Sequence, residues 1–91
     1  MNVHELIVNE LFETKSLAAL IFLIDSGREL EFVVDKNECF ITRDNSKKYV
    51  SLYVNNNESG FDSVCELIEN AMIEDMRFLA AWNKAELMYL L

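Results

Sequence analysis

The chain has 91 residues, a formal net charge of -8 and a hydrophobic fraction of 52%. A chain of this length builds one domain, which we expect to span residues 1-91, and its apolar content excludes a disordered polymer. The excess negative charge repels nucleic acid and anionic membranes, so neither is expected as a direct partner.

The longest apolar run covers only residues 17–24, which is too short to span a membrane, and the chain opens without a positively charged leader. We therefore expect a cytoplasmic protein. The two cysteines, Cys39 and Cys65, lack the close spacing of a redox or metal motif. Free and mostly buried thiols are the expectation for both.

The N-terminal region predicts helices. Residues 3–13 place apolar side chains at helical spacing, namely Val3, Leu6, Ile7 and Leu11. Residues 17–26 fit either a helix between an N-cap at Ser16 and a terminating Gly27, or a buried strand that turns at residues 25–28. The leucine and alanine content favours the helix, which is our prediction.

The middle of the chain alternates apolar and polar residues with the period of strands. The predicted strands cover residues 29–34, 39–43 and 48–54, joined by turns at 35–38 and 44–47. Leu30, Phe32 and Val34 share one face of the first strand, and Glu29 and Glu31 share the other. Such short connections between successive strands predict an antiparallel meander.

The last third begins with a polar loop at residues 55–60. Ser63 and Glu66 form the capping box of a helix over residues 63–72, and a second short helix after Asp75 is expected to bury Phe78, Leu79 and Trp82. Residues 86–90 fit an edge strand or an extension of that helix. The fold class is thus α+β, a single small domain in which two to four helices pack on a three- or four-stranded antiparallel sheet.

Two segments carry a resemblance. Residues 27–32 with 39–42, and residues 61–82, resemble stretches of small uncharacterised α+β proteins of low-GC Gram-positive bacteria and their prophages, although Asn37, Glu38 and Met76 stand where that pattern has glycine. The resemblance implies a phage or mobile-element context. In size and charge the chain is similar to anti-restriction and anti-CRISPR inhibitors.

No set of residues predicts catalysis. His4 is the only histidine, and it has neither a nucleophile motif nor an orienting partner in the sequence. Gly27 and Gly60 stand alone, so no phosphate-binding loop is present. One histidine and two cysteines match no zinc pattern. We therefore expect no catalytic residue, no metal and no cofactor, and the chain is not expected to be an enzyme.

Acidic residues provide the first candidate binding surface. Residues 58–91 carry seven acidic residues against Arg77 and Lys84. Five of them are candidates for a row of carboxylates that imitates phosphates toward a basic groove: Asp62, Glu66, Glu69, Glu74 and Asp75. The alternative is an ordinary solvated helix face, which every amphipathic helix has.

Tyrosines provide the second candidate surface. Tyr49 and Tyr53, with Val33 and Ile41, are expected to project from the sheet face that helices leave open, where they would bind a partner or form a homodimer. The alternative is that helices cover both faces. Together these features predict a non-enzymatic protein–protein interaction module, specifically an inhibitor that blocks a basic nucleic-acid-binding surface by acidic mimicry. A dimeric structural or accessory domain is the alternative function.

Overall fold

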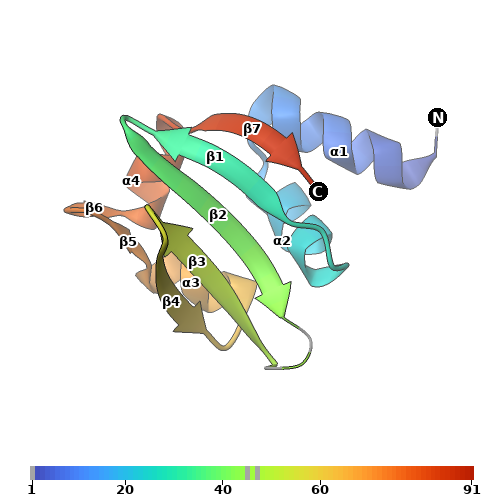
Figure 1. Ribbon diagram of the computed structural model, residues 1–91. Coiled ribbons are helices and arrows are strands. Elements are labelled where there is room, and N and C mark those ends of the chain that lie inside the picture. The colour runs from blue at the N-terminus through green and yellow to red at the C-terminus, as the bar shows by residue number, and fades with distance from the viewer. Residues whose placement is uncertain (1, 45, 47) are drawn as a thin grey trace.

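The computed structural model describes residues 2–44, 46 and 48–91. Four helices and seven strands form within these residues, and Figure 1 labels them. In chain order they are α1 (Val3–Thr14), α2 (Leu17–Asp25), β1 (Leu30–Val34), β2 (Asn37–Asp44), β3 (Tyr49–Val54), β4 (Asn57–Phe61), α3 (Val64–Asn70), β5 (Met72–Ile73), β6 (Met76–Arg77), α4 (Phe78–Asn83) and β7 (Glu86–Leu90).

The main sheet has five antiparallel strands in the order β4-β3-β2-β1-β7, and β5 pairs with β6 in a separate hairpin. Strands β1 to β4 form a meander, and β7 returns from the far end of the chain to pair with β1. The predicted α+β class and meander are therefore confirmed. The described sheet has one strand more than the largest expected number.

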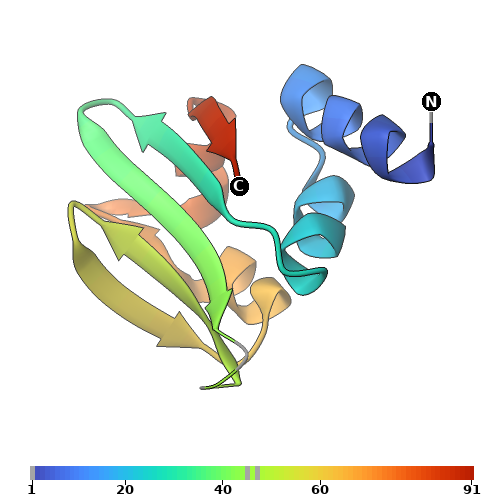
Figure 2. The same ribbon diagram turned by 45° about the vertical axis from the view of Figure 1, so that its right-hand side comes forward.

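Helices α2, α3 and α4 lie on one face of this sheet, and no described helix lies on the other (Figures 1 and 2). Helix α1 packs against α2 and projects beyond the sheet (Figure 2). None of the described helices has the length and apolar character needed to cross a membrane. The sheet thus has one covered face and one open face.

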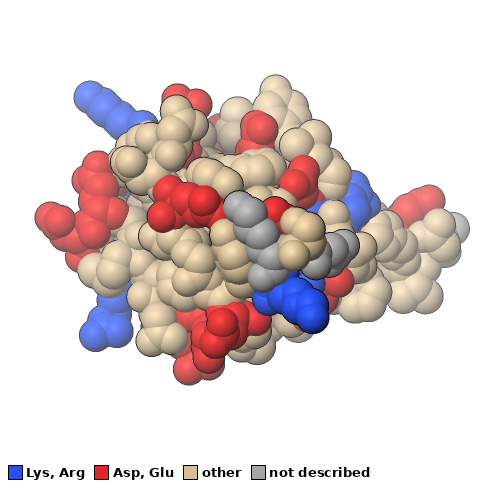
Figure 3. Space-filling view, turned by 60° about the horizontal axis from the view of Figure 1, so that its bottom comes forward, with Lys and Arg blue, Asp and Glu red and all other residues tan. Residues whose placement is uncertain are grey.

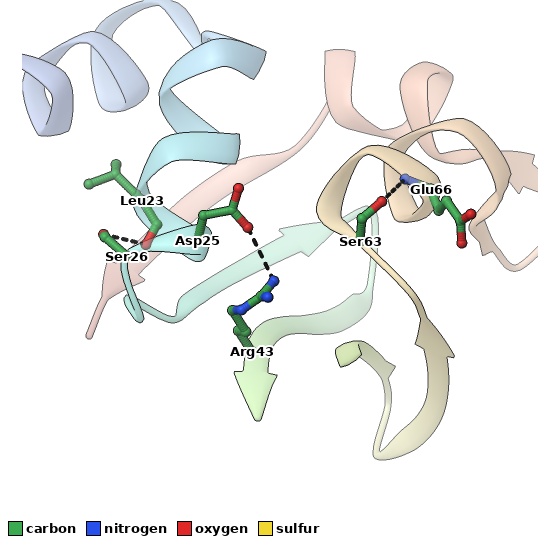
Figure 4. Close-up of polar contacts among 6 residues, drawn as sticks. All are labelled: Leu23, Asp25, Ser26, Arg43, Ser63 and Glu66. Carbon is green, nitrogen blue, oxygen red and sulfur yellow. Dashed lines mark hydrogen bonds and ion pairs between the residues drawn. The ribbon is translucent and has the colours of Figure 1, made fainter. Parts of the chain in front are cut away.

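Residues 17–25 form a helix, so the prediction of a helix rather than a strand is confirmed. The Ser16 hydroxyl accepts a hydrogen bond from the Ala19 amide at 3.2 Å, as an N-cap does. At the other end, Asp25 forms an ion pair with Arg43 of β2 at 3.2 Å (Figure 4). This pair joins the end of α2 to the end of a strand.

The core fills the space between the covered face and the helices. Leu30, Phe32 and Val34 of β1 are buried there, in agreement with the predicted alternation. The ring of Phe32 meets Trp82 edge-on at 5.5 Å between centroids, and Trp82 stacks on Phe78 at 5.6 Å. Aromatic pairs in these geometries stabilise a core beyond their buried area, so α4 is held firmly on the sheet.

Lys15 connects α1 to α4. Its backbone ends α1 in the left-handed conformation (φ 52°), and its ammonium donates to the carbonyls of Trp82, Asn83 and Ala85 at 3.2, 3.0 and 2.8 Å. The Trp82 indole donates in return to the Lys15 carbonyl at 2.9 Å. A cation at the carbonyl end of a helix satisfies groups that the helix itself leaves unpaired.

Residues 55–60 are not a polar loop, and that prediction was wrong. Asn55 and Asn56 both have positive φ, 49° and 72°, and they form a two-residue hairpin turn. Asn57–Phe61 then returns as β4. Asparagine is well suited to this turn, but the following residues have few of the side chains that favour strands, so the hydrophobic pattern does not reveal β4.

Other expected boundaries also need correction. Helix α3 ends at Asn70 instead of residue 72, and the exposed Met72 belongs to β5. Leu79 of α4 is exposed, whereas Phe78 and Trp82 are buried as expected. Residues 86–90 form a strand, β7.

Two turns were predicted between the first three strands. The turn predicted at 35–38 is shorter, since Asn37 and Glu38 already pair with β1. In the turn predicted at 44–47, residues 45 and 47 lie outside the described residues, while the amide and hydroxyl of Ser46 both bond to the Asp44 carboxylate.

Candidate functional site

The open face of the sheet carries a row of five side chains, one from each strand. Successive residues of a strand point to alternate faces of the sheet. Residues that are directly paired on neighbouring strands point to the same face. The pairing of the strands aligns, across the sheet from β7 to β4, Tyr89, Glu31, Phe40, Tyr53 and Glu58. Aromatic rings and carboxylates thus lie side by side on the face that no described helix covers.

A shift in register places Tyr89 in this row. Between β1 and β7, Tyr89 is opposite Glu31 and Leu87 is opposite Phe32, which leaves Met88 as the extra residue of a β-bulge. Met88 and Tyr89 are 41% and 60% exposed. Large apolar side chains with this exposure are available to a binding partner.

An open groove of about 600 Å³ lies along the row. Its walls include Val33, Phe40, Tyr53, Met88 and Tyr89, and the rings of Phe40 and Tyr53 lie 6.2 Å apart. The charged residues that line it among those described are Glu31 and Glu38, with no lysine or arginine. A volume of this size is typical of ligand-binding sites, and the charge of this one is negative.

On β3 and β4, the open-face side chains form hydrogen bonds with one another. The Ser51 hydroxyl donates to the Glu58 carboxylate at 2.6 Å, and the Tyr49 hydroxyl lies 3.4 Å from the same oxygen. The Tyr49 ring lies over Gly60, where an added Cβ would come within 3.1 Å of it. Tyr49 therefore covers the glycine of an edge strand, which is a structural task.

The tyrosine surface is corrected at one position. Ile41 is fully buried in the core, and Phe40 occupies the open face in its place. Val33, Tyr49 and Tyr53 lie on the open face as expected, with Tyr53 beside Phe40.

The five acidic candidates of the C-terminal region lie on two separate elements. Glu66 and Glu69 lie on α3 and Asp62 lies just before its N-cap, while Glu74 and Asp75 form the turn of the β5–β6 hairpin, and all five are exposed. Figure 3, which views the molecule from the end where β2 leads to β3, shows acidic side chains in several separate clusters. A continuous row along one helix does not form.

Glu66 also has a structural task. Its amide donates to the Ser63 hydroxyl at 3.0 Å (Figure 4), and its carboxylate accepts from the Asp62 amide at 3.3 Å. The predicted capping box is therefore present, with the return bond displaced to Asp62. Asp62 and Glu66 line a second hollow of about 500 Å³ together with Tyr49 and Glu58.

The histidine and cysteines are placed apart from one another. The Arg28 guanidinium, which can only donate, lies 2.7 Å from Nε2 of His4, so this nitrogen accepts. Cys39 is buried, and burial raises the pKa of its thiol to about 11, whereas Cys65 is exposed, contrary to the expectation of burial. Among the described residues no three histidine, cysteine, aspartate or glutamate side chains gather as a metal site would require.

Sequence reasoning missed Glu31, Phe40, Met88 and Tyr89 as residues of one surface. A signal for the first two was present in the sequence. Strict alternation along a strand puts Phe40 on the other face of the sheet from Ile41, and Glu31 on the other face from Phe32. The bulge that brings in Met88 and Tyr89 has no comparable signal.

In comparisons with protein-family models, with curated proteins and with solved structures, nothing matches this chain.

Proposed function

We propose that this protein is a non-enzymatic protein–protein interaction module that docks a basic protein surface on the open face of its sheet. The observation that carries the proposal is the groove, which combines aromatic walls with the carboxylates of Glu31 and Glu38. Aromatic residues are enriched at protein interfaces, and carboxylates select positively charged partners.

The distribution of charge supports a basic partner. Four of the basic residues already have partners within the fold: Lys15 on backbone carbonyls at the end of α4, Arg28 on His4 and the Leu91 carbonyl, Arg43 on Asp25, and Lys84 on Asp35. The net charge of -8 is therefore carried by acidic side chains over much of the surface. Such a field speeds the approach of a basic protein and weakens as salt is added.

The specific form of this proposal is an inhibitor from a phage or mobile element. A nucleic-acid-binding surface presents lysine and arginine side chains to phosphates, and a carboxylate-rich protein competes for the same side chains. Acidic mimicry of this kind would make the protein anti-CRISPR-like in action. The support is the charge and the groove.

The test compares two double variants of equal net charge. Wild type, Glu31→Gln/Glu38→Gln and the control Glu69→Gln/Glu74→Gln are immobilised, a host lysate is passed over each, and a retained protein is purified. We expect wild type and the control variant to retain the partner, and the groove variant to lose it. In a gel-shift assay, the purified partner should release DNA when the wild-type protein is added. Retention that survives the groove substitutions and about 0.5 M salt contradicts the proposal.

One observation favours the alternative of a dimeric structural or accessory domain. Val3 and Leu6 of α1 and Phe22 of α2 are 70%, 53% and 48% exposed, which leaves apolar surface on the projecting helices. A second copy of the chain would cover such a surface in a symmetric dimer. Light scattering over a concentration series tests this function: a mass that doubles in wild type but not in Leu6→Lys supports it, and a constant monomer contradicts it.

A further inference from the structure

Glu31 lies between two aromatic residues on the open face. Its partners across the strand pairs are Tyr89 on β7 and Phe40 on β2. Neighbouring strands are about 4.8 Å apart, so the backbones that carry Tyr89 and Phe40 are separated by roughly 10 Å. A flat group that stacks on an aromatic ring needs about 3.5–4 Å on each side, so this separation accommodates one such group above the Glu31 carboxylate.

The Glu31 carboxylate has no ion pair or hydrogen bond with any other residue that the structure describes, although the residue is half-buried. A carboxylate partly removed from water is stabilised by a cation or by hydrogen-bond donors. The chain itself does not supply a cation in the groove, because the described residues that line it include no lysine or arginine.

A second set of carboxylates lies one step along the same face. Val33, the next open-face residue of β1, is opposite Glu38 on one side and Glu86 on the other. Open-face positions on a strand are two residues apart, which is about 6.8 Å, and side chains two residues apart in an extended peptide have the same spacing. A peptide lying along β1 would therefore meet negative charge at every second residue.

Resting on the proposed function, we propose that the groove binds an extended peptide segment of the partner through an Arg-x-Arg pair. The first guanidinium lies flat between the Tyr89 and Phe40 rings and pairs with the Glu31 carboxylate. The second pairs with Glu38 and Glu86. Arginine suits this site better than lysine, because its planar guanidinium stacks on rings and pairs with a carboxylate through two donors.

The experiment titrates the protein with the synthetic peptide acetyl-Gly-Ser-Arg-Val-Arg-Ser-Gly-amide. Binding is followed by backbone amide chemical shifts and by calorimetry. Two matched peptides replace both arginines, one with citrulline, which is neutral and of the same shape, and one with lysine. Two matched variants of the protein, Glu31→Gln and the control Glu69→Gln, each lose one negative charge.

We expect the arginine peptide to shift the amides of β1, β2 and β7. Citrulline should weaken binding by at least about tenfold, and lysine by a smaller factor. Glu31→Gln should also weaken it by about tenfold, whereas Glu69→Gln should stay within about twofold of wild type. Tyr89→Leu keeps the charge and removes a stacking ring of an exposed residue, so it should weaken binding of the arginine peptide more than that of the lysine peptide.

Equal binding of the arginine and citrulline peptides overturns the proposal, as does an equal response of the two glutamine variants. Absence of binding by every peptide also overturns it. If a captured protein still depends on Glu31 and Glu38 in that case, the proposed function stands while the arginine pair fails. If capture does not depend on them, both fail. The amide spectrum of each variant, compared with that of wild type, shows that the variant is folded.

Discussion

The two faces of the sheet come from the same strands and differ in almost every physical property. On the covered face, Phe32 and Ile41 are buried against the helices. On the open face, the residues next to them in sequence, Glu31 and Phe40, line a groove with negative charge. A period of two thus lets one strand contribute to the core with one set of side chains and to the proposed binding surface with the other.

The largest difference between the faces should appear in stability. Phe32→Ala removes a ring that packs on Phe78 and Trp82, and it should lower the free energy of unfolding by about 3–5 kcal/mol. Phe40→Ala, a substitution of the same kind on the open face, should lower it by only about 1 kcal/mol, because the ring is half-exposed. Urea denaturation measures both, and equal losses would show that the open face is part of the core.

Loss of the hydrogen bonds by which Lys15 connects α1 to α4 should have the next largest effect on the free energy of unfolding. Lys15→Met keeps the apolar stem and removes the donors to three backbone carbonyls at and just after the end of α4, so it should lower the free energy of unfolding by about 2 kcal/mol. Lys36→Met, in an exposed turn, removes the same charge and should be nearly neutral. Denaturation curves of the two variants are compared with wild type, and a similar cost for both would contradict the connection.

Cys39, on the covered face, should make stability depend on pH in the alkaline range. Burial favours the neutral thiol and raises its pKa from 9.0 to about 11. The stabilisation is therefore fully present below pH 9.0 and is lost as pH rises through about 11. Between these limits wild type should lose about 2 kcal/mol more than Cys39→Ala. Parallel pH profiles for the two proteins would show that the thiol does not contribute.

The smallest effect is expected at the N-terminus of α3. Ser63→Ala removes the hydroxyl that accepts from the Glu66 amide and should cost about 1 kcal/mol. Glu69→Gln, on the exposed side of the same helix, should leave stability within about 0.5 kcal/mol of wild type. Because Glu66 takes part in the cap, Glu69 is the better position for a control that removes one charge from α3 and leaves the cap intact.

The sequence patterns predicted the covered face better than the open one. Alternation through Leu30, Phe32 and Val34 determines which side of β1 meets the helices, and the serine caps locate α2 and α3. Burial is a strong and periodic signal, so these elements were predicted correctly.

The candidate site was predicted only in part, for three physical reasons. Strand β4 lacks strand-forming residues and depends on a turn with positive φ at Asn55 and Asn56. The bulge at Met88 depends on the pairing of β7 with β1, two segments far apart in the chain. Glu31 becomes part of a row only through its partners on adjacent strands, and the local sequence does not determine which residues pair across strands.

The most direct test of the open face as the binding surface is amide chemical-shift mapping of the protein with its purified basic partner. If the partner docks in the groove, the largest changes will fall on β1, β2 and β7, and the amides of α3 and of the β5–β6 hairpin will change little. Changes concentrated on α3 and that hairpin, with β1 and β2 unaffected, would contradict it.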